Sequence, residues 1–333
     1  MPLLDARSEG EFGSGHIPGS ANLPMLNDAE RVLVGTDYKQ KGRDAAIRTG
    51  FRLVGPRLEQ LIDDASRLAG ARKKVLVYCW RGGMRSSFLA TFIRMAGMDA
   101  TTLAGGYKAY RRAAADAFTQ PLPLLVVGGR TGSGKTDVLQ ALATCGEQVI
   151  DLEGLAKHKG SAFGGLMHPP QPSTEQFQNE LFEALMRMDR TRPIWIEDES
   201  IAIGRVFLPD AFWQQKRAAP VIEVDLDTDA RIDRLVQEYG PADREEFLAA
   251  MTRITRKLGG QHFNAARDFL LSGDMHNTIR ILLTYYDKNY DNSLSKKSGQ
   301  ILDRIHWTGS DKERLIADLI ACSRANSSGI VRC

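Results

Sequence analysis

The chain has 333 residues, of which 43% are hydrophobic and 26% are charged, so it is long enough for two globular domains with sizeable cores. We find no run of 18 apolar residues and no basic block followed by an apolar one at the N-terminus, which argues against a membrane span or a secretory signal and predicts a cytoplasmic protein. Four widely spaced cysteines are too few for a disulfide framework or a structural zinc site.

The net charge of +3 is unevenly distributed along the chain. Residues 1–118 contain 18 Lys and Arg against 12 Asp and Glu, whereas the remaining residues contain 26 against 29. A basic half suits a polyanionic partner such as RNA, although an excess of this size also occurs on ordinary solvated surfaces. Charge alone therefore leaves RNA binding open.

The first half alternates strand, loop and helix in the manner of an α/β fold. Residues 3–6 and 74–78 are predicted to be short buried strands, and residues 87–96 a helix that follows the second strand. Residues 1–118 are therefore predicted to form one domain. Residues 119–123 are predicted to be a linker, because two prolines interrupt any helix there.

Residues 124–333 are predicted to form a second α/β domain. Strands are expected at 124–127, 193–196 and 221–224, and a helix at 136–143. From about residue 228 the pattern becomes mainly helical, with apolar residues at three- and four-residue spacing over 231–239, 244–258 and 275–286. The polar stretch 287–299 is expected to be a loop.

A glycine-rich motif follows the first strand of this second domain. Gly129–Thr136 fits G-x-x-x-x-G-K-[ST] and lies between a predicted strand and a predicted helix, as a P-loop requires. Its backbone N–H groups would surround a phosphate, Lys135 would reach a terminal phosphate, and Thr136 could hold Mg²⁺. The expected phosphate-binding residues are Gly129, Gly132, Ser133, Gly134, Lys135 and Thr136. The motif does not say whether the ligand is a nucleotide or another diphosphate.

Three consecutive acids, Glu197, Asp198 and Glu199, end a neighbouring predicted strand. P-loop enzymes place a carboxylate there to hold the metal ion, directly or through water. Consecutive side chains point in different directions, so the sequence does not decide which of the three takes part. An ordinary charged strand end is the alternative interpretation.

Cys79 follows a buried strand and begins a loop that leads into a helix. We expect the loop N–H groups and the helix dipole to favour a thiolate, with Arg81 and Arg85 adding positive charge. Gly82 and Gly83 would let the loop surround an anion such as phosphate, thiosulfate or selenophosphate. The Cys-x5-Arg spacing also occurs in protein phosphatases. The loop alone therefore leaves sulfur transfer and phosphate-ester hydrolysis both open.

Longer segments on both sides of this loop resemble a rhodanese domain. Residues 4–24 resemble the opening signature of such domains and Leu103–Tyr107 the closing one, so the resemblance covers nearly all of 1–118. It favours sulfur or selenium transfer over phosphatase chemistry. Rhodanese-like domains usually carry extra residues ahead of the first signature, so we expect the first strand of the sheet to be shortened or missing.

Together with the P-loop half, the whole chain resembles the tRNA 2-selenouridine synthase family. The resemblance is strongest at 35–42, 79–86, 129–136, 151–164 and 197–200. It implies replacement of sulfur by selenium at the wobble 2-thiouridine of tRNA. Selenophosphate and geranyl diphosphate would be co-substrates, with an S-geranylated intermediate.

The resemblance also implies roles for individual residues. Cys79 would be the carrier or nucleophile for selenium, and the P-loop with Lys135 would hold the diphosphate. Lys157, His158 and Lys159 are expected to contact substrate or RNA. Two alternatives remain: a rhodanese-type sulfurtransferase fused to an ATP-dependent small-molecule kinase, and a regulatory protein that binds ligands without chemistry. The oligomeric state and the tRNAs chosen stay open.

Overall fold

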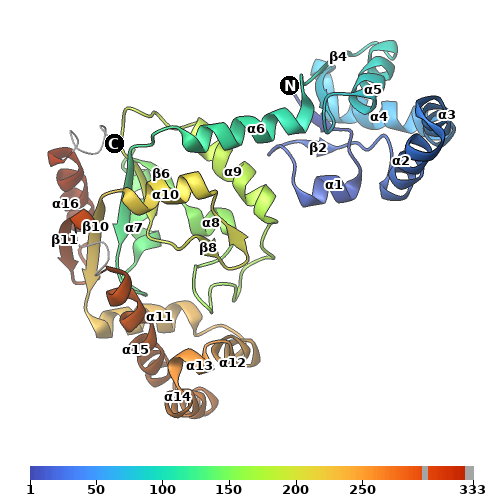
Figure 1. The fold of residues 1–333 in the computed structure, drawn as a ribbon. Coiled ribbons are helices and arrows are strands. Elements are labelled where there is room, and N and C mark those ends of the chain that lie inside the picture. Colours follow the sequence, from blue (N-terminus) through green and yellow to red (C-terminus); the bar gives the residue numbers. More distant parts are fainter. Residues whose placement is uncertain (295–298, 327–333) are drawn as a thin grey trace. The chain divides into compact units, whose positions relative to one another are not determined.

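The computed structural model describes residues 1–294 and 299–326. The chain forms two compact units, the first made of Met1–Ala117 with Gln178–Phe182 and the second of Phe118–Phe177 with Glu183–Cys333. Each unit contains a parallel β-sheet with helices, as Figure 1 shows. The α/β class predicted for both halves is therefore confirmed. No helix in the described part of the chain is long and apolar enough to cross a membrane.

The first unit contains a four-stranded parallel sheet in the order β2-β1-β3-β4. Its strands are β1 (Leu3–Asp5), β2 (Ala21–Asn22), β3 (Lys74–Tyr78) and β4 (Asp99–Thr102). Its helices are α1 (Glu9–Ser14), α2 (Asp28–Lys41), α3 (Arg43–Val54), α4 (Leu58–Ala69), α5 (Met84–Met95) and α6 (Gly106–Thr119). Leu4, Val77 and Leu89 are fully buried in its core, as expected where helices cover a parallel sheet.

Helices α2 and α3 form a hairpin that the sequence did not predict. The Asn27 side chain accepts a hydrogen bond of 2.8 Å from the Glu30 N–H, and the Glu30 carboxylate accepts one of 2.9 Å from the Asn27 N–H. This reciprocal cap fixes the start of α2. Gly42 ends α2 and begins α3 with a φ of +88°, which glycine adopts at little cost.

The second unit contains a five-stranded parallel sheet in the order β11-β10-β5-β7-β6. Its strands are β5 (Leu124–Gly128), β6 (Gln148–Ile150), β7 (Ile194–Glu197), β10 (Val221–Leu226) and β11 (Ile301–Trp307), and β8 (Ala202–Ile203) pairs with β9 (Val206–Phe207) apart from it. Every residue of β5 is buried, as its central place in the sheet requires. The helices that accompany these strands are α7 (Lys135–Thr144), α8 (Leu152–Ala156), α9 (Thr174–Met186), α10 (Asp210–Ala218) and α16 (Lys312–Ala325), although residues 178–182 of α9 belong to the first unit.

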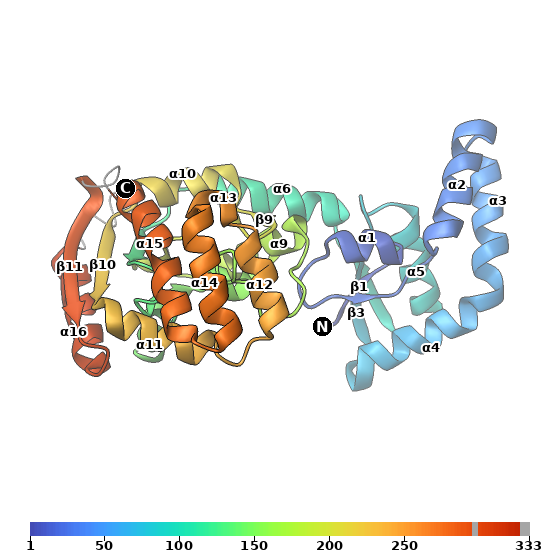
Figure 2. The ribbon, with the colours of Figure 1, turned by 90° about the horizontal axis from the view of Figure 1, so that it is seen from below.

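A helical part follows β10 and has a core of its own. It contains α11 (Thr228–Tyr239), α12 (Arg244–Thr252), α13 (Thr255–Leu258), α14 (Gly260–Ser272) and α15 (Met275–Leu294), and Figure 2 shows the last four side by side. Phe247, Met251, Leu270 and Leu282 pack in this core together with Phe163 from an earlier loop. The mainly helical character expected from about residue 228 is present, apart from β11, which was not predicted as a strand.

Several predicted boundaries were wrong. The helix expected over 244–258 is broken, because the N–H groups of Arg253 and Ile254 bond three residues back and tighten the end of α12. The loop expected over 287–299 is helical as far as Leu294, and residues 295–298 lie outside the described part. Helix α6 runs through Thr119, so only residues 120–123 connect it to β5.

Ion pairs explain why the polar end of α15 is helical. Asp287 accepts hydrogen bonds from the buried guanidinium of Arg231, the shorter at 2.5 Å. Asp291 lies 2.9 Å from the Arg130 guanidinium. Two acids of the polar stretch that suggested a loop are thus paired on the helix, and Asp291 connects it to the P-loop residue Arg130.

Candidate functional site

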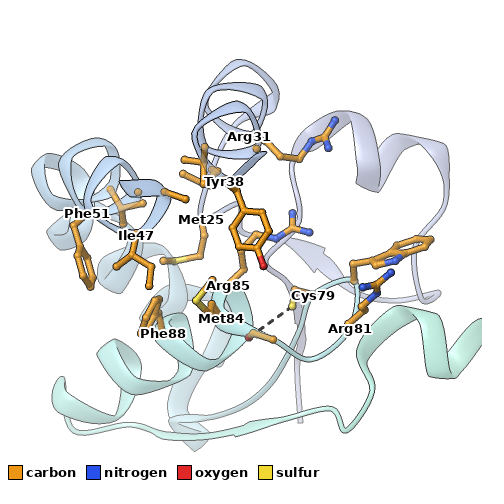
Figure 3. Close-up of a pocket in the computed structure, with 18 of the residues that line it drawn as sticks. Met25, Arg31, Tyr38, Ile47, Phe51, Cys79, Arg81, Met84, Arg85 and Phe88 are labelled. Carbon is orange, nitrogen blue, oxygen red and sulfur yellow. Dashed lines mark hydrogen bonds between the residues drawn. The ribbon is translucent and has the colours of Figure 1, made fainter. Parts of the chain in front are cut away.

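Cys79 lies directly after β3, at the start of the loop that leads to α5. Its side chain is buried and carries no disulfide. The sulfur lies 3.2 Å from the Ser86 hydroxyl and 3.9 Å from the Gly83 carbonyl oxygen, the second contact being drawn in Figure 3. The thiol is therefore held at the N-terminus of α5, where free N–H groups and the helix dipole attract anions.

The closing segment 103–107 holds the cysteine loop in place. The Tyr107 N–H donates to the Cys79 carbonyl oxygen at 2.9 Å, and the Lys108 N–H donates to the Trp80 carbonyl oxygen at 2.9 Å. Gly106 has a φ of +59°, and a Cβ on it would collide with the Cys79 carbonyl oxygen. The backbone of the closing signature thus packs against the cysteine loop, with no room for a side chain at Gly106.

The two arginines of the loop differ in whether they are free to bind an anion. Arg85 forms two hydrogen bonds with the Glu11 carboxylate, at 2.5 and 3.2 Å. Burial opposes ionisation of Glu11, but its hydrogen bonds and charge contact with Arg85 prevail and hold the pKa of that carboxyl below its ordinary value. Arg81 is exposed and forms no ion pair within the described part of the chain. Arg81 is therefore the cation that an incoming anion would meet first.

An apolar cavity of about 430 Å³ opens beside Cys79. Helices α2, α3 and α5 line it, as Figure 3 shows, and the side chains drawn there include Met25, Tyr38, Ile47, Phe51, Met84 and Phe88. Outside the cysteine loop, neither the cavity nor its lining was predicted, because no helix was predicted over residues 28–54. The cysteine loop thus lies at the edge of a cavity whose apolar walls suit a hydrocarbon group.

The P-loop connects β5 to α7. Its three glycines have positive φ values, +149° at Gly129, +82° at Gly132 and +86° at Gly134. The Lys135 ammonium donates to the Gly129 carbonyl oxygen at 2.9 Å, so it lies over the loop. Of the expected phosphate-binding residues, Gly132, Gly134, Lys135 and Thr136 line a cavity of about 490 Å³, whereas Gly129 and the buried Ser133 lie outside its lining.

The structure separates the three acids at the end of β7, of which Glu197 is the last strand residue. Glu197 is fully buried and accepts a hydrogen bond of 2.9 Å from the Leu152 N–H, and burial raises the pKa of its carboxyl well above the ordinary value. Asp198 lies 3.3 Å from the Lys216 ammonium. Glu199 is the only one of the three that lines the P-loop cavity. Glu199 is therefore the acid placed to act on a bound phosphate or its metal ion.

Glu153 on α8 is a site residue that sequence reasoning missed. Its carboxylate accepts a hydrogen bond of 2.9 Å from the Thr136 hydroxyl. Burial first, and then the neighbouring Glu199, raises the pKa of Glu153 to about 7, and burial also raises the pKa of Glu199. Two such carboxyls do not both ionise readily. The only sequence signal was the family-like segment 151–164, in which no acid stood out.

The cavity fits a magnesium ion that arrives with a phosphate. Across the described ranges, no group of three or more His, Cys, Asp and Glu side chains could hold a metal on its own. Thr136, Glu153 and Glu199 nevertheless offer oxygen ligands on one cavity wall. Mg²⁺ takes few protein ligands and completes its shell with water and phosphate oxygens, which matches this set.

A larger cavity of about 1,000 Å³ adjoins the P-loop cavity and shares Gly160, Ser161, His168 and Tyr286 with it. Its exposed cations are Lys157, Arg205, Arg253 and Lys257.

The structure places Lys157, His158 and Lys159 at two different cavities. Lys157 and His158 line the larger cavity, and burial lowers the pKa of His158. Lys159 lines the P-loop cavity and lies 2.8 Å from the Glu238 carboxylate.

Comparison with known proteins places these sites in a family. Residues 1–113 match the family described as the rhodanese-like domain, and residues 122–315 match the one described as the tRNA 2-selenouridine synthase AAA domain. A protein of Nitrosomonas europaea named tRNA 2-selenouridine synthase is 35% identical, over 89% of this chain and 90% of that protein. This chain belongs to the tRNA 2-selenouridine synthase family.

Other members show the same extent of similarity. A protein of Marinobacter nauticus with that name is 35% identical, over 91% of each chain. One from Shewanella sp. strain ANA-3 is 36% identical, over 91% of this chain and 92% of its own. The matches span both units, so the family resemblance noted in the sequence is confirmed along nearly the whole chain.

Proposed function

We propose that this chain converts the wobble 2-thiouridine of tRNA into 2-selenouridine in the cytoplasm, using selenophosphate and geranyl diphosphate as co-substrates. The names of its relatives support the tRNA substrate and the selenium product. One observation carries the proposal: a single chain holds two separate anion sites, the loop of Cys79 and the P-loop cavity. Two phosphate-bearing co-substrates require two such sites.

The first step is assigned to the P-loop cavity. The sulfur of 2-thiouridine attacks the first carbon of the geranyl chain, a C–S bond forms, the C–O bond breaks, diphosphate leaves, and the N3 proton of the base passes to the departing diphosphate or to water. The P-loop N–H groups and Lys135 stabilise the charge that develops on the leaving group. Mg²⁺ held by Thr136 and Glu199 would neutralise further charge on it. Leu235 and Tyr286 supply an apolar wall beside the phosphates.

The second step is assigned to Cys79. Alkylation of the sulfur makes it a good leaving group, so the Cys79 sulfur attacks C2 of the base and geranylthiolate leaves and takes up a proton. Selenium of selenophosphate then displaces Cys79 from C2, and water cleaves the P–Se bond to release phosphate. Atoms and electrons balance without an oxidant or a reductant. Arg81 and the N-terminus of α5 would hold the phosphate group.

The larger cavity of the second unit supports a nucleic-acid substrate. Lys157, Arg205 and Arg253 are exposed cations suited to backbone phosphates. Tyr285 and Tyr286 line the same cavity and could stack on an unpaired base. Because this cavity adjoins the P-loop cavity, a base bound beside the phosphates would have its backbone near these cations.

Mass spectrometry of nucleosides tests the proposal. The purified native chain is incubated with 2-thiouridine tRNA, geranyl diphosphate and selenophosphate, and digested tRNA is analysed. We expect 2-selenouridine, and no selenium product when geranyl diphosphate is left out. Unchanged 2-thiouridine together with hydrolysis of added ATP would contradict the proposal and favour a sulfurtransferase fused to a kinase.

A further inference from the structure

The apolar cavity beside Cys79 is larger than the binding of a small anion requires. Its volume of about 430 Å³ falls within the roughly 300–1,000 Å³ that is typical of small-molecule sites. Each of three helices presents one face to it, because the lining positions recur at three- and four-residue spacing. These positions are Arg31, Val34, Gly35 and Tyr38 on α2, Ala46, Ile47, Gly50, Phe51 and Val54 on α3, and Met84, Arg85, Phe88 and Phe92 on α5.

The cavity wall leaves hydrophobic side chains uncovered. Phe51 is 52% exposed, Tyr38 55% and Met84 41%. Large apolar side chains gathered at one exposed cavity mark a binding site more often than a plain surface. The helices could also fill the space themselves, because a Cβ on Gly35 or Gly50 would meet no other atom within 4 Å. The open volume is therefore built into the helix sequences.

Polar groups gather at one end of this cavity. Cys79, Arg81 and Arg85 line it together at the cysteine loop, whereas Ile47, Phe51 and Phe88 lie away from Arg81, on the other side of Cys79, in Figure 3. A ligand that fits has a reactive, polar end at the thiol and a hydrocarbon tail between the helices. Inorganic phosphate or a bare nucleoside would leave the apolar part filled only by water.

We propose that this cavity binds the prenyl chain of the S-geranylated uridine while C2 of the base faces Cys79. The inference rests on the proposed function, in which this intermediate reaches the cysteine. Burial of each methylene strengthens binding by about fourfold, so the cavity selects the alkylated nucleoside over 2-thiouridine and selects long chains over short ones. It also holds the leaving thiol away from water once the C–S bond breaks.

Gly35 offers a substitution that fills the cavity without disturbing the fold. It lies on the cavity face of α2, four residues after Arg31 and three before Tyr38, and its added side chain would meet open space. Replacing a glycine inside a helix also favours the helix. Gly13 in α1 is a matched control, because its Cβ also meets no atom within 4 Å and it lies outside the cavity lining.

The test measures binding of 2-thiouridine nucleosides that carry S-geranyl, S-dimethylallyl or S-methyl groups to the full chain by equilibrium dialysis. We expect affinity for the geranyl nucleoside to exceed that for the methyl one by at least about tenfold, and Gly35→Leu to remove most of this difference. Gly13→Leu should bind as the native chain does. Thermal melts of both variants should match or exceed the native melt.

Binding that does not depend on chain length, or that Gly35→Leu leaves unchanged, would overturn the inference. A native dimer that Gly35→Leu dissociates in sedimentation, with no preference for long chains, would show that a second copy covers the cavity instead. Failure of the proposed function would give a different result from failure of this inference. In that case no selenouridine would form, whatever the length of the S-alkyl group on the nucleoside. Selenouridine formed equally well from the S-methyl and S-geranyl nucleosides would overturn the inference alone.

Discussion

At the scale of single residues, the protonation of Glu153 should control how the P-loop cavity receives an anion. Its pKa of about 7 means that it is neutral in mild acid and charged above neutrality, beside Lys135 and Glu199. A charged Glu153 repels a diphosphate but attracts Mg²⁺. The cavity should therefore bind metal-free diphosphate in acid and magnesium diphosphate in base.

We predict that, without metal, pyrophosphate binds more weakly to the native chain as pH rises from 6 to 8. In Glu153→Gln the pH dependence should flatten, and affinity at pH 8 should rise about tenfold because one like charge is removed. Titration calorimetry in a chelator at both pH values measures this, with the exposed Glu59→Gln on α4 as control. Because pyrophosphate itself loses a proton in this range, the two chains are compared at each pH. The same pH dependence in the native chain and in Glu153→Gln would show that Glu153 does not titrate there.

The same raised pKa has a consequence for stability. A carboxyl whose folded pKa is about 7 rather than 4.5 contributes stability that is complete below pH 4.5 and is lost as pH rises through 7. Glu153→Gln should therefore gain about 1–3 kcal/mol in unfolding free energy relative to the native chain at pH 8, and little at pH 5. Urea denaturation of both chains at the two pH values measures this difference in unfolding free energy. A gain of the same size at pH 5 and pH 8 would contradict the prediction.

At the scale of elements, the closing segment sets the shape of the cysteine loop. In Gly106→Ala the new methyl would collide with the Cys79 carbonyl oxygen at a φ of +59°, so the loop must shift. We predict at least a tenfold loss of selenium incorporation while geranylated tRNA still forms. Gly97→Ala is the matched control, because its φ is +82° but its Cβ meets no atom within 4 Å. Similar losses of selenium incorporation in both variants would point to general instability instead.

Elements with strong local patterns could be predicted from the sequence. Apolar runs identified β3, β5 and β7, and the glycines with Lys135 identified the P-loop. Helix α2 was missed because none of its residues is buried, so it lacks a hydrophobic period. The contact between Glu153 and Thr136 was missed because it joins residues 17 positions apart, and spacing rules for helices and strands do not reach that far.

At the scale of the whole molecule, Arg231 fastens the P-loop to the helical part of the second unit. It is 1% exposed, donates to the Thr131 carbonyl oxygen at 2.9 Å, and pairs with Asp287 on α15. Replacement of Arg231 by an apolar residue would leave Asp287 without this cation and would remove the hydrogen bond to the Thr131 carbonyl oxygen of the P-loop. The helical part and the P-loop should therefore lose stability together.

We predict that Arg231→Met lowers the unfolding free energy of the second unit by about 3–5 kcal/mol. Arg280→Met is the control, because its pair with Asp229 is exposed on both sides and should cost less than about 1 kcal/mol. Calorimetry measures both variants. A change in Arg231→Met no larger than in Arg280→Met would show that the pair does not hold the P-loop.

Binding of tRNA should depend on the cations of the larger cavity. We predict that Arg253→Ala and Lys257→Ala each lower the slope of log affinity against log salt concentration by about 1, because each phosphate contact releases counterions. Arg267→Ala on α14 is a control outside the cavity lining. Filter binding of tRNA over a salt series measures the slopes. Slopes unchanged in both cavity variants would place the RNA on another surface.

The central claim is a division of labour between the P-loop cavity and Cys79. Mass spectrometry of tRNA nucleosides from the Cys79→Ala and Lys135→Ala variants, supplied with both co-substrates, tests it most directly. We expect geranylated thiouridine to accumulate with Cys79→Ala, neither product to form with Lys135→Ala, and selenouridine to return when the two variants are mixed. Selenouridine made by Cys79→Ala alone, or geranylation left intact in Lys135→Ala, would contradict it.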